Sequence, residues 1–150
     1  MSVIAETASR PSQLVQVARW ALVGMECLVA VGALYGGIGL MAQNAIDISD
    51  EWLIGTPFDS WLLPGALLLL VVAAPMTIAA VAELFRVRWA YGASLVAGAA
   101  QVGWIAAQWL IMQRFFVLQP IMFIAGLLVL LLAWAAHRGD ANSFDAKSLR

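Results

Sequence analysis

The sequence has very few of the residues that carry redox, metal or covalent chemistry. Its 150 residues include one cysteine, Cys27, which cannot form an internal disulfide or carry out dithiol exchange. The one histidine, His137, cannot supply both ligands of a bis-imidazole haem, and Lys147 lies in a polar tail, away from any intramembrane Schiff base. The H-E-x-x-H motif and Gly-rich phosphate loops are absent too, so we expect no enzymatic activity, no cofactor and no metal site.

Charge is also scarce. Only 11% of the residues are charged and 63% are hydrophobic, against about 25% and about 45–50% in soluble globular domains. The apolar residues form long blocks, which excludes an ordinary soluble fold. The net charge is −1 and basic residues do not cluster, so a nucleic-acid partner has no electrostatic support.

Four apolar stretches predict four membrane-spanning helices, over residues 17–41, 61–85, 89–112 and 118–136. Each has the roughly 20 residues that a bilayer requires. The apolar run at 21–41 exceeds the about 7–15 residues of a signal peptide core, which favours a retained helix. We therefore expect an all-α membrane protein, with one four-helix domain over 1–150 and short polar tails at 1–13 and 137–150.

Basic residues predict the orientation of the bundle. If both termini are cytoplasmic, seven basic residues lie inside and only Arg114 lies outside; the seven are Arg10, Arg19, Arg86, Arg88, Arg138, Lys147 and Arg150. This places the one long loop, residues 42–60, on the extracytoplasmic side. The loop is acidic, but its spacing does not match a calcium-binding EF-hand. One turn of helix is expected around Trp52.

Glu26 is the one acidic residue well inside the first span. Burying an acidic residue in a bilayer costs roughly 2.5–3.5 kcal/mol on insertion scales, so such a residue is a candidate functional site. Small residues share its helix face, which indicates contact with other helices; they are Ala30, Ala33 and Gly37. Glu26 could titrate and exchange a proton for a cationic or polar substrate, or it could be a hydrogen-bonded packing group.

The third span carries a polar stripe. Ser94, Gln101 and Gln108 are spaced by seven residues and share a face, which Trp104 borders. These residues could line a polar site opposite Glu26. They could instead form interhelical hydrogen bonds, each worth about 0.6 kcal/mol.

Small residues and prolines predict how the helices pack. One face of the first span and one of the third would allow another backbone to approach, within the subunit or between subunits; the residues are Gly32, Gly36, Gly39, Gly92, Ala99 and Gly103. Pro75 should kink the second span, with Thr77 helping to satisfy the freed backbone. The fourth span has no strongly polar residue and is expected to be peripheral.

Aromatic residues gather in and after the long loop. Trp52, Phe58 and Trp61 could form a surface for lipids or a partner, or they could be an ordinary interfacial aromatic belt.

Over residues 32–135 the chain resembles a widespread, uncharacterised group of small bacterial four-span membrane proteins. The resemblance rests on five motifs: Gly36-Gly37-x-Gly39-Leu40-Met41, Gly55-Thr56-Pro57-Phe58, Trp61-Leu62-x-Pro64-Gly65, Gly103-Trp104-Ile105-x-x-Gln108 and Leu118-Gln119-Pro120. It implies the fold and a location in the bacterial plasma membrane, without an activity.

A weaker similarity, in the placement of Glu26, is to the small multidrug resistance transporters. In that family a first-span Glu binds protons or drugs. The present chain departs from it by its long outer loop, its greater length and the lack of a matching aromatic site in the third span.

Two functions are consistent with these observations. The first is a small accessory or scaffold subunit that docks on a larger transport or cell-envelope complex. The alternative is a homodimeric proton-coupled transporter or binding protein for a small amphipathic or cationic molecule, whose site holds Glu26, Ser94, Gln101, Trp104 and Gln108. The expected partners are membrane lipids and other integral membrane proteins or a second copy of the chain.

Overall fold

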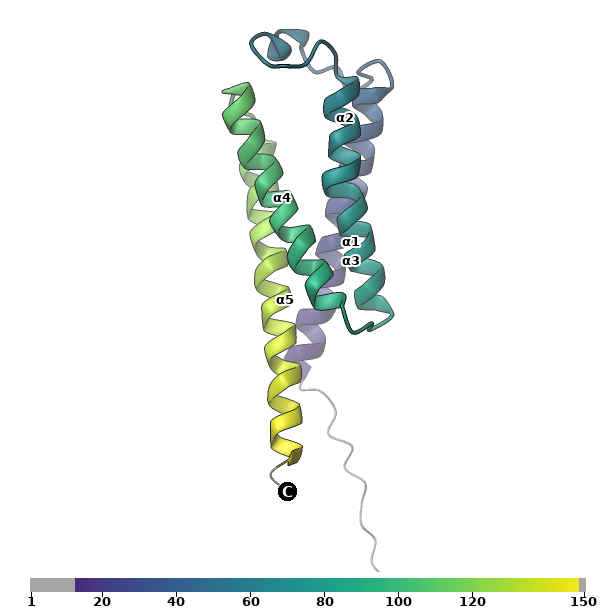
Figure 1. Cartoon of the computed structure of the whole chain (residues 1–150), viewed down its shortest axis with the longest axis vertical. Coiled ribbons are helices and arrows are strands. Elements are labelled where there is room, and N and C mark those ends of the chain that lie inside the picture. Colours follow the sequence, from purple (N-terminus) through teal and green to yellow (C-terminus); the bar gives the residue numbers. More distant parts are fainter. Residues whose placement is uncertain (1–12, 149–150) are drawn as a thin grey trace, which may run out of the picture.

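The computed structural model describes residues 13–148, with side chains described as far as Arg138. It is helical throughout, and the described part contains no strand. The elements are α1 (Gln13–Met41), η1 (Asp50–Leu53), α2 (Leu62–Leu68), η2 (Leu69–Ala73), α3 (Ala74–Leu84), α4 (Ala90–Met112) and α5 (Leu118–Ser148) (Figure 1).

Four helical segments are long and apolar enough to cross a membrane, as the sequence predicts. They are Gln13–Met41, Leu62–Leu84, Ala90–Met112 and Leu118–Arg138. The second is the continuous run of α2, η2 and α3. Part of the predicted polar tail at 137–150 is helical, because α5 continues to Ser148. Nearly all of the predicted tail at 1–13 lies outside the described residues.

The helices form a ring in which α1 lies diagonally opposite α4. α1 packs against α2, η2, α3 and α5, whereas α4 packs against η2, α3 and α5. The prediction that the fourth span is peripheral is therefore wrong. Ala125, Val129 and Ala133 of α5 are buried against the core, because small and β-branched side chains let this helix approach two neighbours.

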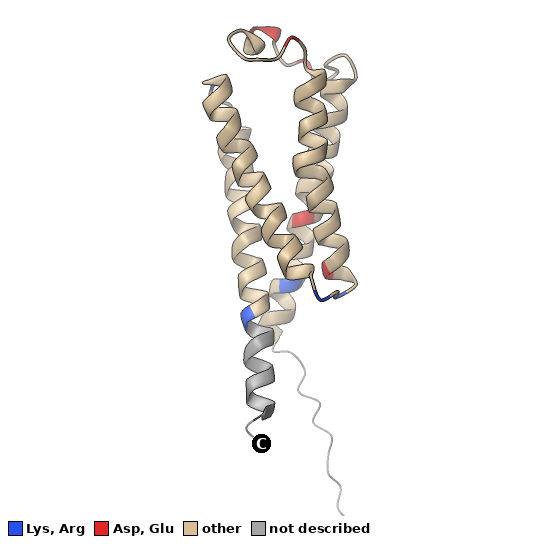
Figure 2. Cartoon of the chain, viewed as in Figure 1, with Lys and Arg blue, Asp and Glu red and all other residues tan. Residues whose placement is uncertain are grey.

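The ring is not uniform along its length. Toward the end that carries residues 42–61, the α4–α5 pair diverges from the α1–α2 pair (Figure 1). We call this half of the bundle the loop half, and the other the terminal half. The described acidic residues lie mainly at the loop end, and basic residues gather at the opposite end (Figure 2).

Pro75 changes the helix type rather than only bending it. The five residues before Ala74 form the π-helix η2, in which the amide of Ala74 donates to the carbonyl of Leu69. A proline has no N–H for the carbonyl one turn earlier, and a π-turn is one way to absorb that loss. The Thr77 hydroxyl donates to the Ala73 carbonyl at 2.8 Å, whereas the carbonyl that Pro75 leaves without its usual amide is that of Val71.

The long loop is held by its own hydrogen bonds. Its short helix is η1, a 3-10 turn that includes Trp52, as the sequence predicts. The indole N–H of Trp61 donates to the Asp50 carboxylate at 2.8 Å, and the Ile48 amide donates to the Asn44 side chain at 3.2 Å. The loop is thus an ordered cap on the loop half.

Candidate functional site

Glu26 lies fully buried in the terminal half. Its side chain is 0% exposed, and neither carboxyl oxygen has a hydrogen-bond partner among the described residues. The Ser94 hydroxyl, also 0% exposed, is near enough to interact with the carboxyl, but it does not meet hydrogen-bond geometry. The structure thus brings Glu26 and Ser94 together across the α1–α4 diagonal. A buried polar pair without hydrogen bonds is costly, which marks it as a candidate for function.

A second buried acid lies close to Glu26. Glu83 of α3 is 5% exposed and accepts a hydrogen bond from Arg19 Nε of α1 at 2.9 Å. The sequence analysis assigned no role to Glu83, and so missed this pair. Comparing the depth of charged residues in the membrane could have found it, because Arg19 and Glu83 lie near the same membrane surface on adjacent spans. The pair ties α1 to α3 below Glu26.

A cavity of about 340 Å³ separates the two helix pairs in the loop half. Its walls come from α1, α2, η2, α4, α5 and the long loop, and they are mostly apolar or aromatic. Among the described residues that line it, none is charged. Val29, one turn above Glu26 on α1, lies in its wall, while Glu26 itself does not. The carboxyl therefore lies outside the cavity, on the side of the terminal half.

Two residues of the cavity wall each carry a buried polar atom without a partner among the described residues. Gln101, 2% exposed, donates from Nε2 to the Met122 carbonyl at 3.2 Å, which leaves its Oε1 buried and unpaired. The Nε1 of Trp104, one turn along α4, is buried and unpaired as well. Most buried polar groups in folded proteins find partners, so an unpaired acceptor and an unpaired donor on one wall require an explanation.

The residues of the polar stripe of α4 thus lie in two different environments. Ser94 faces the buried Glu26, whereas Gln101 and Gln108 line the cavity together with Trp104. The predicted site residues are all on the interior side of α4, but they do not form one cluster. The division follows from length, because the stripe runs over four turns of helix.

The three aromatic residues predicted to form a surface at the long loop also lie in two different environments. Trp52 meets Phe116, in the turn before α5, edge to face at 5.8 Å between ring centroids, and both rings line the cavity. Trp61 is 6% exposed and also lines it. Phe58 is half-buried and lies outside the cavity wall. Two of the three residues therefore close the cavity from the loop side.

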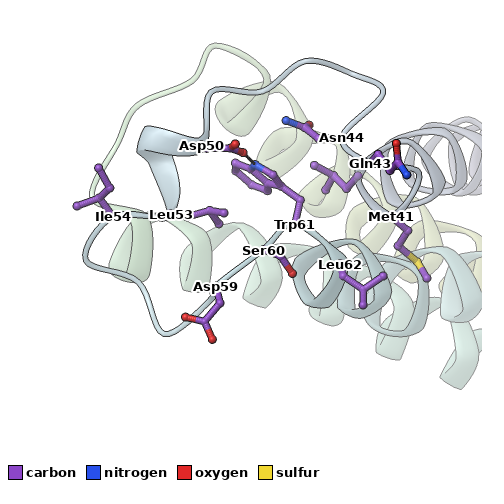
Figure 3. Close-up of a pocket in the computed structure, with 11 residues that line it drawn as sticks. Met41, Gln43, Asn44, Asp50, Leu53, Ile54, Asp59, Ser60, Trp61 and Leu62 are labelled. Carbon is purple, nitrogen blue, oxygen red and sulfur yellow. Dashed lines mark hydrogen bonds between the residues drawn. The ribbon is translucent and has the colours of Figure 1, made fainter.

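The loop encloses a second pocket, of about 530 Å³, on its other side. Figure 3 shows Trp61 in the middle of this pocket, with its indole nitrogen bonded to Asp50. Asn44, Asp59 and Ser60 also line it. Leu40 and Trp61 line both this pocket and the apolar cavity.

The glycines of α1 contact α2 and the loop. A Cβ on Gly37 would lie 2.6 Å from Leu69 Cδ2, and one on Gly65 of α2 would lie 2.7 Å from the Gly37 carbonyl. A Cβ on Gly36 would reach Leu68 at 3.4 Å, and one on Gly39 would reach Ile46 at 2.6 Å. These contacts are within the subunit. Gly32 differs, because nothing lies within 4 Å of its Cβ position.

The close approach on α4 involves different residues from those that the sequence suggested. Gly92, Ala99 and Gly103 are exposed, and no side chain of the described chain lies within 4 Å of a Cβ on either glycine. Gly98 instead faces α5, where a Cβ would lie 2.9 Å from Leu130 and 3.2 Å from the Gly126 carbonyl. Both faces of α4 are rich in small residues, so composition alone did not distinguish them. The exposed face stays available for contact between subunits.

Gln119, to which the sequence assigned no role beyond the Leu118-Gln119-Pro120 motif, has a structural role here. Its side-chain oxygen accepts from the Trp109 indole at 2.9 Å and from the Phe116 amide at 3.1 Å. These bonds fix the turn that carries Phe116 onto the loop end of α4. The partner of Trp52 is thereby held in place.

Comparison of the chain with protein-family models, with characterised proteins and with solved structures finds no match. The described residues contain no group of three or more His, Cys, Asp or Glu that could hold a metal ion.

Proposed function

We propose that this protein binds a small amphipathic molecule in the cavity between its two helix pairs. The observation that carries the proposal is the cavity itself, whose mostly apolar and aromatic wall includes the amide side chains of Gln101 and Gln108 and the indole of Trp104. Ligand sites in proteins combine mostly apolar walls with a few placed polar groups in this way.

The membrane setting fits such a ligand. With both termini cytoplasmic in a bacterial plasma membrane, the cavity lies in the extracytoplasmic half of the bilayer and the long loop covers it. An amphipathic molecule partitions into that leaflet and would reach the cavity between the diverging helix pairs. The aromatic side chains of Trp52, Trp61 and Phe116 provide apolar area at the loop end.

The test is co-purification. Ala33 lines the cavity, so Ala33→Phe should fill part of it, while Val96→Phe adds the same ring to a position of α4 that is 64% exposed. We expect small apolar compounds to be extracted from wild-type protein and from Val96→Phe, and to be depleted in folded Ala33→Phe. Equal recovery from all three proteins would contradict the proposal.

A coupling role for Glu26 is an extension of this proposal. Glu26 and Ser94 lie one turn beyond the cavity wall at Val29, in a position to respond to a molecule above them. In proteoliposomes, Glu26→Gln should abolish proton flux driven by the ligand while leaving cavity binding intact. Equal, measurable flux in the two proteins would remove Glu26 from the coupling mechanism. No flux in either protein would leave Glu26 a packing residue, and the protein a binding protein without proton coupling.

The accessory-subunit function is a second candidate, favoured by the exposed face of α4. Gly92, Ala99 and Gly103 are exposed on it, and such faces commonly carry contacts between membrane helices. Ala99→Cys, in a chain whose own thiol is removed by Cys27→Ser, provides a specific cross-linking site. We expect a disulfide-linked dimer, or an adduct with another membrane protein, in native membranes. If Ala99→Cys cross-links no better than Val81→Cys on exposed α3, this candidate fails.

A further inference from the structure

The wall of the apolar cavity is exposed on one side of the bundle. The exposed residues that line it are Gly32 and Tyr35 of α1, Phe116 of the turn before α5, and Leu118 of α5. The lining residues that come from α2, η2 and α4 are all buried or half-buried. The cavity therefore opens between α1 and the first turn of α5. We call the part of the wall formed by these exposed residues the lateral mouth.

Gly32 leaves space at the lateral mouth. Nothing lies within 4 Å of a Cβ built on Gly32, whereas a Cβ on Gly36, one turn along α1, would lie 3.4 Å from Leu68. Leu118, at the other edge of the mouth, is 49% exposed. The residues of α5 that belong to the buried core all lie farther from the long loop than Leu118; they are Ala125, Val129 and Ala133. The helix thus joins the core below the mouth.

The opposite side of the cavity, between α2 and α4, is closed. Pro64 of α2 and Val72 of η2 are buried there, and so is Ile105 of α4. The π-helix η2 also packs against α4. A molecule that entered on this side would have to separate packed helices.

The lateral mouth lies at the depth of lipid acyl chains. At about 1.5 Å per residue, Tyr35 and Gly32 lie about 9 Å and about 14 Å along α1 from its loop end at Met41. The hydrocarbon of one leaflet is roughly 15 Å thick. Val29, the deepest wall residue of α1, lies about 18 Å from the same end, so the cavity extends through about one leaflet.

The chemistry of the wall favours a hydrocarbon chain. None of the described residues that line the cavity is charged, and moving a charged head group there without a partner would be strongly unfavourable. An unfilled apolar space loses the dispersion contacts of its lining atoms. In a bilayer the molecules that stand at such an opening are lipid chains, so they are the ones available to fill it.

We infer that a membrane lipid of the extracytoplasmic leaflet inserts one acyl chain into the cavity through the lateral mouth, while its head group stays at the membrane surface. This inference rests on the proposed function and names the class of molecule that is bound. Gly32 and Leu118 are the residues that set the width of the entrance.

The test is photolabelling from the lipid. The full-length protein is placed in phosphatidylcholine nanodiscs in which part of the lipid carries a diazirine near the end of one acyl chain. Illumination attaches the chain to residues that it touches, and mass spectrometry identifies them. Ile105 and Val72, 4% and 1% exposed, line the cavity and are shielded from the lipid around the protein. Val96, 64% exposed and outside the wall, reports that surrounding lipid.

We expect adducts on Ile105 and Val72 in the wild-type protein. Gly32→Phe places a ring at the lateral mouth and should lower these adducts about tenfold relative to those on Val96, because the ring and the chain compete for the same space. Gly24→Phe is the matched control and should leave them unchanged. Gly24 also has nothing within 4 Å of its Cβ position, but it lies outside the cavity wall.

A second variant narrows the lateral mouth from the other helix. Leu118→Trp enlarges an exposed side chain at the start of α5 and should also lower the adducts on the two buried wall residues. It decides the question if Gly32→Phe does not fold.

The possible failures are distinguishable. If Ile105 and Val72 carry no adducts while Val96 is labelled, no acyl chain enters the cavity and the inference is wrong. If both mouth variants are labelled like the wild type, the chain enters elsewhere and the lateral mouth is wrong. In either case the proposed function stands if extracted compounds are depleted in Ala33→Phe. Equal recovery from that variant would remove the cavity as a binding site.

Discussion

The two halves of the bundle use the same helices in opposite ways. In the terminal half the four helices close on one another, and most of the buried side chains there are alanines: Ala79, Ala80, Ala82, Ala90, Ala97, Ala133 and Ala136. In the loop half, close contact is kept between α1 and α2 at Gly37 and Gly65, while α4 and α5 lie apart from that pair. Larger residues line the gap, and a cavity results.

The polar groups differ between the halves as well. The terminal half holds an ion pair between Arg19 and Glu83, and one turn of helix or more above it the Glu26–Ser94 pair. The loop half holds single neutral groups on a cavity wall. Small side chains and an ion pair suit a fixed anchor, whereas an apolar cavity with a few neutral polar residues in its wall suits a site that receives a ligand. The following predictions test that division.

The largest effect is expected from breaking the ion pair in the terminal half. Arg19→Met leaves the Glu83 carboxylate buried without its cation, and we expect the free energy of unfolding to fall by about 3 kcal/mol. The double variant Arg19→Met/Glu83→Leu should recover most of this loss, because no buried charge is left behind. Unfolding in mixed micelles titrated with dodecyl sulfate measures both.

Arg88→Met is the control for this pair, because Arg88 is exposed at the same end of the bundle. It should change the free energy of unfolding by less than about 0.5 kcal/mol. If Arg19→Met lowers the free energy of unfolding no more than Arg88→Met does, the ion pair does not anchor the terminal half.

Replacing one alanine by phenylalanine in each half gives the most direct comparison of how closely the two halves are packed. Ala97→Phe places a ring in the closed core, where Ala97 is 0% exposed, and should destabilise the protein by about 1–3 kcal/mol. Ala33→Phe directs the ring at the cavity and should cost less than about 1.5 kcal/mol. Equal losses, measured by the same unfolding titration, would show that the loop half is as closely packed as the terminal half.

Glycines test which helix contacts belong to the subunit. A Cβ on Gly65 would lie 2.7 Å from a backbone oxygen, which cannot move as a side chain does, so Gly65→Ala should cost about 1–2 kcal/mol. Gly103→Ala meets nothing within 4 Å and should be neutral or slightly stabilising in a monomer. Gel filtration in mild detergent adds the second readout, because a dimer that uses the exposed α4 face would be weakened by Gly103→Ala alone.

Hydropathy was sufficient to predict the four spans, and heptad spacing was sufficient to predict that Ser94, Gln101 and Gln108 face inward. Neither hydropathy nor heptad spacing could predict the cavity. The spacing of residues along a helix assigns each residue to a face, but it does not fix the distance from that face to the opposite helix. That distance depends on pairwise contacts such as Gly98 with α5, and on the π-helix before Pro75.

The partners of charged residues were equally hard to predict. Arg19 and Glu83 are 64 residues apart, and their pairing follows only once α1 and α3 are known to be neighbours. Arg86 and Arg88 are the basic residues nearest to Glu83 in the sequence, and that proximity gives no indication of Arg19. Matching the depth of buried charges on different spans would have been a better guide than sequence proximity.

The smallest effect is expected at the contact between the long loop and the α4–α5 turn. The edge-to-face contact of Trp52 with Phe116 joins the long loop to the α4–α5 turn, and such pairs contribute about 0.5–1.5 kcal/mol beyond their area. Trp52→Ala should therefore lower stability only slightly, but it should open the cavity to water-soluble reagents.

In a Cys27→Ser chain, a maleimide should label Ile105→Cys, on the cavity wall, faster when Trp52 is replaced. Ile54→Ala, in the same loop and 79% exposed, should leave that rate unchanged. Equal labelling rates in all three proteins would mean that the cavity is reached from between the helix pairs alone, so the loop would cover the site without controlling access to it.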